Sequence, residues 1–157
     1  MAVYRIVQEE DPVLRQKSKK VPAVTPNVVR LLDNLKDTLA AQKTGVGLAA
    51  PQIGITKRVI VVRLQEEENF YELINPEIVE SEGAERDSEG CLSIPNWVGE
   101  VDRAARIRVK ALDRMGNPAE YAAEGYLARV FQHEIDHLDG ILFVDRAIKL
   151  SPAEQEK

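Results

Sequence analysis

The chain has 157 residues, of which 44% are hydrophobic and 30% are charged, and these proportions are typical of a globular protein with one hydrophobic core. The length predicts one domain over residues 1–150, followed by a polar, frayed tail over residues 151–157. The formal net charge of −5, without a strong basic cluster, argues against direct binding of nucleic acid.

The first predicted element is a helix that begins at Thr25 and Pro26, because a hydroxyl at the cap and a proline in the first helical position are both favoured there. Leucines and valines then recur at helical spacing, and the helix is expected to end near Lys43. The β-branched run Arg58–Leu64 predicts a strand, and the polar residues 66–69 predict an exposed turn.

Further strands are predicted at residues 73–74 and 78–79, with an interruption at Asn75–Pro76. The alternating segment Ile107–Leu112 predicts another strand, half-buried. A second helix is predicted over Tyr126–Asp139, and the glycine that follows it is typical of a helix end. One early helix, a middle part rich in short strands and one late helix together predict an α+β fold.

Both histidines of the chain, His133 and His137, lie in the second predicted helix. Residues four apart project from one face of a helix, so one metal ion can meet both imidazoles. Glu134 can reach a water molecule at that metal, and the pattern is the H-E-x-x-H arrangement of metal hydrolases. The alternative is a surface helix with two incidental histidines. The metal site is favoured because both histidines fall in one motif on a predicted helix.

A catalytic metal site usually has a third protein ligand, and the sequence points upstream for it. Phe143 stands where some H-E-x-x-H proteases have a third histidine, and the only glutamates downstream of the motif, Glu154 and Glu156, lie in the polar tail. Cys91 is therefore the candidate, because a thiolate with two imidazoles suits a borderline metal such as zinc or ferrous iron. A small buried cysteine without a metal is the alternative.

Cys91 is the only cysteine, which excludes an internal disulfide. The sequence contains no apolar signal region and no apolar stretch of the length of a membrane span. These features favour a reducing, cytoplasmic location and argue against a membrane partner.

A glycine-rich segment over residues 45–54 permits two interpretations. Its first part fits the dinucleotide fingerprint G-x-G-x-x-A, but that fingerprint follows a strand and opens a helix, whereas here a helix precedes it and Pro51 follows. A tight loop with exposed amides and the side chain of Gln52 suits an oxyanion or substrate-backbone site better. Taken alone, the segment would be interpreted as a purely structural loop.

Three segments, in this order, resemble the peptide deformylase family, which shows G-x-G-L-A-A-x-Q, then E-G-C-L-S, then Q-H-E-x-D-H-L. The matching residues are Gly45–Gln52, Glu89–Ser93 and Gln132–Leu138, without a mismatch, and the general resemblance extends from Tyr4 to Lys149. It implies an α+β fold with short antiparallel strands around a central helix that carries H-E-x-x-H.

The resemblance also implies a metal-dependent hydrolase that removes the formyl group from the N-terminal formyl-methionine of nascent polypeptides and releases formate. It implies one divalent metal, usually Fe²⁺ in the family, which Zn²⁺, Ni²⁺ or Co²⁺ can replace. Carried over by position, the metal ligands are Cys91, His133 and His137. Glu134 corresponds to the general acid/base, and the oxyanion donors correspond to Gln52 and the backbone amide of Leu92.

The resemblance places the substrate methionine against Val46, Gly47, Tyr126 and Val130, although Arg129 indicates a wall that is not uniformly apolar. We expect two differences from other members of the family. Many bacterial members carry a basic residue seven positions after the cysteine, where this chain has Val98 beside Trp97. Some members also end in a long helix implicated in ribosome docking, and the sequence up to Lys157 predicts none.

Two other functions fit parts of the pattern. A general H-E-x-x-H metallopeptidase would use the same helix and cleave internal peptide bonds of unformylated peptides. A binding module would hold a structural metal, and such a site is closed by four protein ligands. The sequence offers no fourth ligand, which favours a hydrolase.

Overall fold

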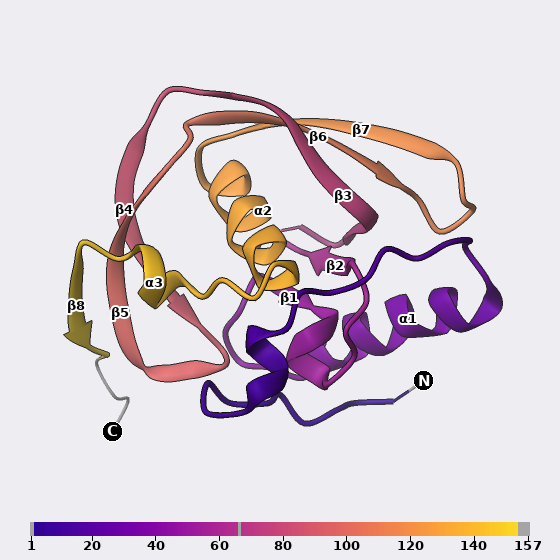
Figure 1. Ribbon diagram of the computed structural model, residues 1–157, viewed down its shortest axis with the longest axis horizontal. Helices are drawn as coiled ribbons and strands as arrows, with labels where there is room; N and C mark the ends of the chain where they lie inside the picture. The colour runs from indigo at the N-terminus through magenta and orange to yellow at the C-terminus, as the bar shows by residue number, and fades with distance from the viewer. Residues whose placement is uncertain (1, 66, 154–157) are drawn as a thin grey trace.

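Two antiparallel sheets and a helix between them form the computed structural model, which describes residues 2–65 and 67–153 (Figure 1). The first sheet has five strands in the order β1-β2-β3-β6-β7, over Gly47–Ala49, Val59–Val62, Tyr71–Glu82, Arg106–Leu112 and Pro118–Glu124. The second has three strands in the order β4-β5-β8, over Glu85–Cys91, Ile94–Arg103 and Lys149–Pro152. The predicted α+β fold is confirmed.

Three α-helices and two 3₁₀ helices complete the described chain. The α-helices are α1 (Pro26–Ala40), α2 (Gly125–Leu138) and α3 (Phe143–Arg146), and the 3₁₀ helices are η1 (Pro12–Arg15) and η2 (Ala50–Ile53). The helix α2 occupies the centre of the molecule, with β4 and β5 on one side and the five-stranded sheet on the other (Figure 1).

Strand β2 shows how the sheet separates two parts of the core. All four of its residues are buried, and successive side chains of a strand point to opposite faces. Ile60 and Val62 pack with residues of α2, whereas Val59 and Val61 pack with residues of α1. The fully buried Phe131 of α2 lies edge-to-face against Tyr71 and is part of the first group. This packing fixes the helix α2 against the sheet.

The helix boundaries follow local capping chemistry. The Thr25 hydroxyl accepts a hydrogen bond from the Val28 amide at the start of α1, as predicted. The helix ends at Ala40, slightly before the predicted end near Lys43. Gly140, at φ +75°, follows α2 in the left-handed conformation that glycine adopts without strain.

The predicted interruption at Asn75–Pro76 is wrong, because β3 runs through it as one strand. The register against β6 shifts between Ile74 and Glu77, so the irregularity is a bulge within the strand. Asn75 has φ 54°, and its side-chain amide makes two hydrogen bonds with the backbone of Val21, which compensate for the distorted ladder. The bulge therefore bends the strand without ending it.

The chain after residue 150 also differs from the prediction. Ser151 and Pro152 pair with Val98 and Trp97 in strand β8, and the Ala153 amide donates to the Asn96 carbonyl. The frayed tail therefore does not begin at Ser151, while residues 154–157 lie outside the described residues, as does Glu66 of the predicted turn.

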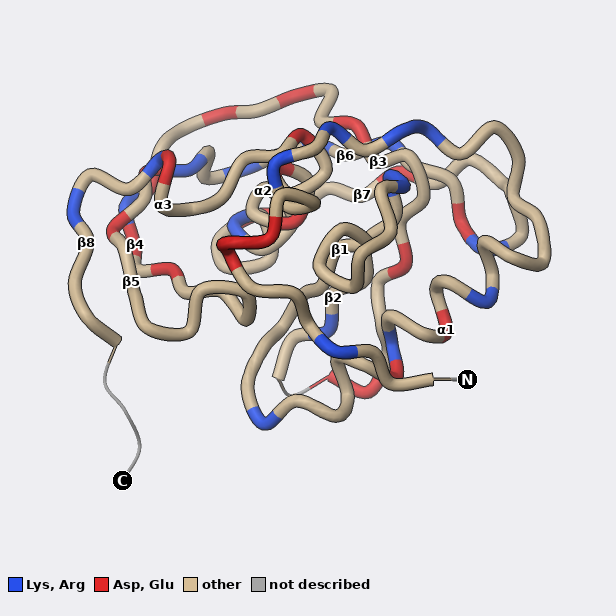
Figure 2. The backbone as a smooth tube through the Cα atoms, turned by 60° about the horizontal axis from the view of Figure 1, so that its bottom comes forward, with Lys and Arg blue, Asp and Glu red and all other residues tan. Residues whose placement is uncertain are grey.

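Basic and acidic residues are interspersed along the chain in Figure 2. On the five-stranded sheet they form ion pairs across strands, as Arg108 of β6 does with Glu80 of β3 and Glu120 of β7. Among the described helices, none has the length and apolar character that crossing a membrane requires.

Candidate metal centre and active-site cavity

Cys91, His133 and His137 converge although the cysteine is far from the histidines in the sequence. Their potential ligand atoms all lie within 4.8 Å of one another. The Cys91 Sγ is 3.4 Å from the His137 Nε2. Both imidazoles are buried, and Cys91 is partly buried. The three residues predicted as metal ligands are thus brought together at one point between α2 and the end of β4.

The β4–β5 hairpin places the cysteine at this point. Cys91 is the last residue of β4 and pairs with Ile94, the first residue of β5. The register of the ladder shifts between Glu89 and Cys91, just before the turn. The sequence analysis did not predict this hairpin. The approach of Cys91 to the helix α2 could therefore not be predicted from geometry.

Glu134 is buried beside these ligands, with only 4% of its surface exposed. Among the described residues, its Oε1 has no hydrogen-bond partner. Burial raises the pKa of Glu134 to about 7, because the attraction of His133 compensates only in part and the charge of Glu89 adds to the shift. A carboxyl group with such a pKa can accept and release a proton near neutrality.

Gly47 provides the space that Glu134 occupies. A Cβ atom at position 47 would lie 2.6 Å from the Glu134 Oε2, closer than real contacts allow. The absence of a side chain in β1 therefore lets the carboxylate lie directly against the backbone of this end strand.

The expected loop over residues 45–54 is a short strand followed by a 3₁₀ turn, β1 and η2. The Ala49 amide donates to the Oε1 of Gln52 at 3.0 Å, and the Gln52 Nε2 donates to the Oγ of Ser93 at 3.1 Å. The Nε2 also lies 3.6 Å from the Cys91 Sγ. These contacts fix the orientation of the buried amide and direct its NH₂ group toward the cysteine.

A buried ionic cluster behind His133 was not predicted. Glu89 accepts hydrogen bonds from His133, Arg103 and Arg129, and all four residues are at most 8% exposed. Arg103 also binds Asp136 of α2. Burial alone would raise the pKa of Glu89, but the hydrogen bonds of Arg103 and His133 outweigh it and hold this pKa well below its usual range.

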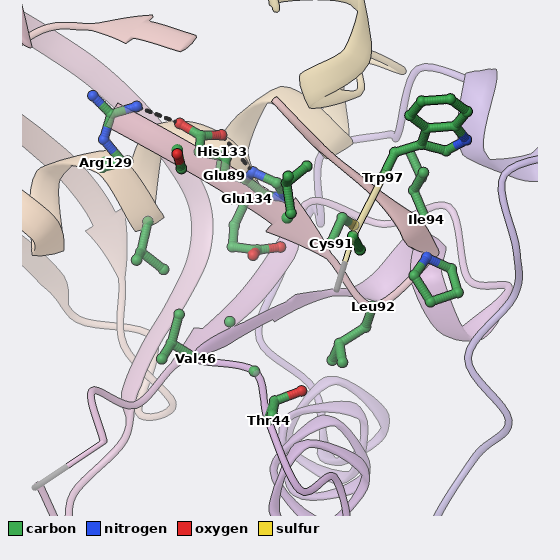
Figure 3. Close-up of a pocket in the computed structure, with 18 of the residues that line it drawn as sticks. Thr44, Val46, Glu89, Cys91, Leu92, Ile94, Trp97, Arg129, His133 and Glu134 are labelled. Atoms are coloured by element: carbon green, nitrogen blue, oxygen red, sulfur yellow. Dashed lines mark hydrogen bonds and ion pairs between the residues drawn. The ribbon is translucent and has the colours of Figure 1, made fainter. Parts of the chain in front are cut away.

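A cavity of about 440 Å³ opens over these groups and is bordered by β1, the β4–β5 hairpin and α2 (Figure 3). Of the predicted site residues, all except His137 line it: Val46, Gly47, Gln52, Cys91, Leu92, Tyr126, Val130, His133 and Glu134. Trp97 and Val98 also line the cavity, and Trp97 remains 41% exposed.

Arg129 contributes less polarity to this wall than the sequence indicated. Its guanidinium lies toward Glu89 in Figure 3 and is bonded to that carboxylate. The residue is 5% exposed, so the paired charge is withdrawn from the open space of the cavity.

Residues 3–153 match the family model described as polypeptide deformylase. The chain belongs to the peptide deformylase family. The peptide deformylase of Pelotomaculum thermopropionicum is 55% identical over 157 residues, which cover 98% of this chain and 99% of that protein. The peptide deformylase of Carboxydothermus hydrogenoformans is 55% identical over 147 residues, covering 94% and 95% of the two chains.

Solved structures of peptide deformylases have the same fold. The crystal structure from Thermotoga maritima is 41% identical, with a TM-score of 0.89 over 95% of this chain and 100% of that chain. The structure from Thermus thermophilus is 47% identical, with a TM-score of 0.86 over 92% and 85%. The family recognised from three sequence motifs is therefore confirmed.

Proposed function

We propose that this peptide deformylase uses the cavity to hydrolyse the formyl amide of N-terminal formyl-methionine on nascent polypeptides, releasing formate. The observation that carries the proposal is the convergence of Cys91, His133 and His137 beside the buried carboxylate of Glu134 and the oriented amide of Gln52. This arrangement offers a metal site, a proton carrier and an oxyanion donor in one cavity.

The donor set fits a single divalent metal. Ligands that meet a tetrahedral metal at bond lengths of ~2.0–2.3 Å lie about 3.5 Å from one another. The Cys91 Sγ and the His137 Nε2 are 3.4 Å apart. The His133 Nδ1 is bonded to Glu89 at 2.9 Å, which leaves its Nε2 as the ligand atom. We propose Cys91, His133 and His137 as the protein ligands.

Ferrous iron is the proposed resident metal, with Zn²⁺, Ni²⁺ and Co²⁺ as replacements. One thiolate and two imidazoles suit all of these borderline ions. Divalent affinity generally rises from iron to zinc, so the geometry of the site and the availability of the metal in the cell have to select iron. A metal held here would supply Lewis acidity, which lowers the pKa of water and polarises a carbonyl oxygen.

The residues around the metal site divide the remaining chemistry between them. Glu134 takes a proton from the attacking water and later delivers it to the leaving amine, for which its pKa of about 7 is suited. The Gln52 Nε2 and the backbone amide of Leu92 donate hydrogen bonds to the oxygen of the formyl group as negative charge develops on it. Because Gln52 is held by Ala49 and Ser93, its amide needs no reorientation during the reaction.

We propose that the methionine side chain lies against Val46, Gly47, Tyr126 and Val130, which line the cavity between β1 and α2. Val98 stands where many bacterial members have a basic residue, so a charged contact to the peptide from this position is replaced by an apolar one. The substrate implies a cytoplasmic location near the ribosome.

The proposal is tested by formate release from formyl-Met peptides, with the same peptides lacking the formyl group as controls and metal content measured in parallel. We expect formate release and no cleavage of the controls. Cleavage of internal bonds in unformylated peptides would indicate a general metallopeptidase instead. A tightly bound metal without either activity would indicate a structural site.

Replacing Gln52 with leucine is expected to lower kcat by ~10²–10³-fold, as loss of one oxyanion donor typically does. The effect on KM should be smaller, because the contact strengthens as charge develops. Steady-state kinetics of formate release measures both constants. Gln42→Leu is the control, since the one hydrogen bond of the Gln42 side chain among the described residues goes to the Thr38 carbonyl near the end of α1. A change confined to KM would make Gln52 a ground-state binder.

A further inference from the structure

Arg129 makes an unusual set of contacts for a residue on a cavity wall. Its Nη1 donates to the Glu89 Oε2 at 2.7 Å and to the Val101 carbonyl at 2.9 Å, and its Nη2 donates to the Glu85 carbonyl at 2.8 Å. The side chain thus connects α2 with both β4 and β5. These three hydrogen bonds of the guanidinium all go to protein groups.

The contacts on Glu89 are divided between its two oxygens. Oε1 accepts from the His133 ring and from Arg103, whereas Oε2 accepts from Arg103 and from Arg129. Arg103 is itself shared, because its Nη1 binds Asp136. Arg129 is therefore the second cation on the carboxylate and fixes the oxygen that does not contact His133. Rotation of the carboxylate about its own axis would break the Arg129 contact and the His133 contact together.

We propose that Arg129 is a positioning residue for the metal ligand His133, acting through Glu89. This inference rests on the proposed metal site. The hydrogen bond from a ligand imidazole to a carboxylate fixes the ring's tautomer and orientation, and loss of such an outer contact typically lowers metal affinity ~10–100-fold. Arg129 lies four residues before His133 on α2, and Glu89 lies two residues before Cys91 on β4. The contact between Arg129 and Glu89 consequently holds together α2 and β4, the two elements that supply the ligands.

Arg129→Met tests this inference, because methionine keeps an unbranched apolar stem against the cavity and removes the guanidinium. The measurement is the dissociation constant of Zn²⁺ for the purified full chain, obtained by competition with a chelator. We expect a rise of ~10–100-fold. Arg129→Lys keeps a charge but not the planar fork, so its rise should be smaller. The absorption spectrum of the Co²⁺ form should change with Arg129→Met, since the ligand field depends on the orientation of His133.

Arg114→Met is the matched control. Arg114 is partly buried and binds the carboxylates of Glu72 and Asp33, away from the residues that line the cavity. The Arg114→Met substitution should lower the melting temperature of the metal-free protein without changing its affinity for Zn²⁺. A purely structural role of Arg129 predicts the same pattern for Arg129→Met, and that result would overturn the inference. An effect on KM alone, at unchanged Zn²⁺ affinity, would overturn it as well.

His133→Ala separates this inference from the proposed function. If His133→Ala loses Zn²⁺ while Arg129→Met binds it as the unmodified chain does, the ligand set stands and the positioning role falls. If His133→Ala retains full Zn²⁺ affinity, the ligand set itself is wrong and both fall. Should Arg129→Met fail to fold, Arg129→Lys takes its place: a weakened affinity supports the role, and an unchanged affinity overturns it.

Discussion

Replacing Glu134 with glutamine is expected to lower kcat by ~10²–10⁴-fold, the usual contribution of a general acid/base group. Glutamine has nearly the same shape and fits the same space against Gly47, but it cannot carry the proton. The metal should remain bound, because the proposed ligands are Cys91, His133 and His137. Formate release and metal content, measured on the same preparation, check both parts of the expectation.

The control for this substitution is Glu124→Gln, which removes one negative charge from an exposed residue directly before the same helix. It should leave kcat close to that of the unmodified enzyme. If Glu134→Gln turned over substrate at a near-normal rate, another group would have to carry the proton. If it instead lost the metal, Glu134 would be acting on the metal site itself.

Cys91→Ala is expected to abolish activity by removing the only thiolate ligand. Two imidazoles on one helix would remain, and a catalytic site with two protein ligands is unusual for zinc or iron. Cys91→Asp keeps an anionic ligand at the same position, so it should retain more metal than Cys91→Ala, although with altered geometry. Metal analysis and formate release of both variants, prepared without oxygen, provide the measurement. Full activity with bound metal in Cys91→Ala would place the third ligand elsewhere.

The features that were predicted best from the sequence are those that depend on the local spacing of residues. The helix α2 and its two histidines follow from a periodicity of 3.6 residues, so their common face required no knowledge of the fold. The cap at Thr25 and the left-handed Gly140 are equally local. The third ligand was reached by elimination and by resemblance, because the distance between Cys91 and the helix depends on a hairpin that the pattern does not predict.

Strand β4 explains why that hairpin was missed. Its sequence, ERDSEGC, is mostly charged, and only Glu89 of its residues is buried. It lacks the apolar alternation from which strands are recognised. The strand is held by its ladder with β5 and by the buried ion pairs of Glu89, which are formed with residues 14 and 40 positions away. Charged residues are normally expected at the surface, so the cluster left no signal in a single sequence.

The contact between Gly47 and Glu134 has a genetic consequence. Every amino acid except glycine has a Cβ atom, and at this position that atom would meet the Glu134 carboxylate 2.6 Å away. Any missense change of the glycine codon, however small the new side chain, therefore displaces Glu134, the proposed proton carrier. Gly47 has no functional group of its own. Its substitution should nevertheless be as damaging to activity as substitution of a catalytic residue, because the proposed reaction depends on the space that glycine leaves free.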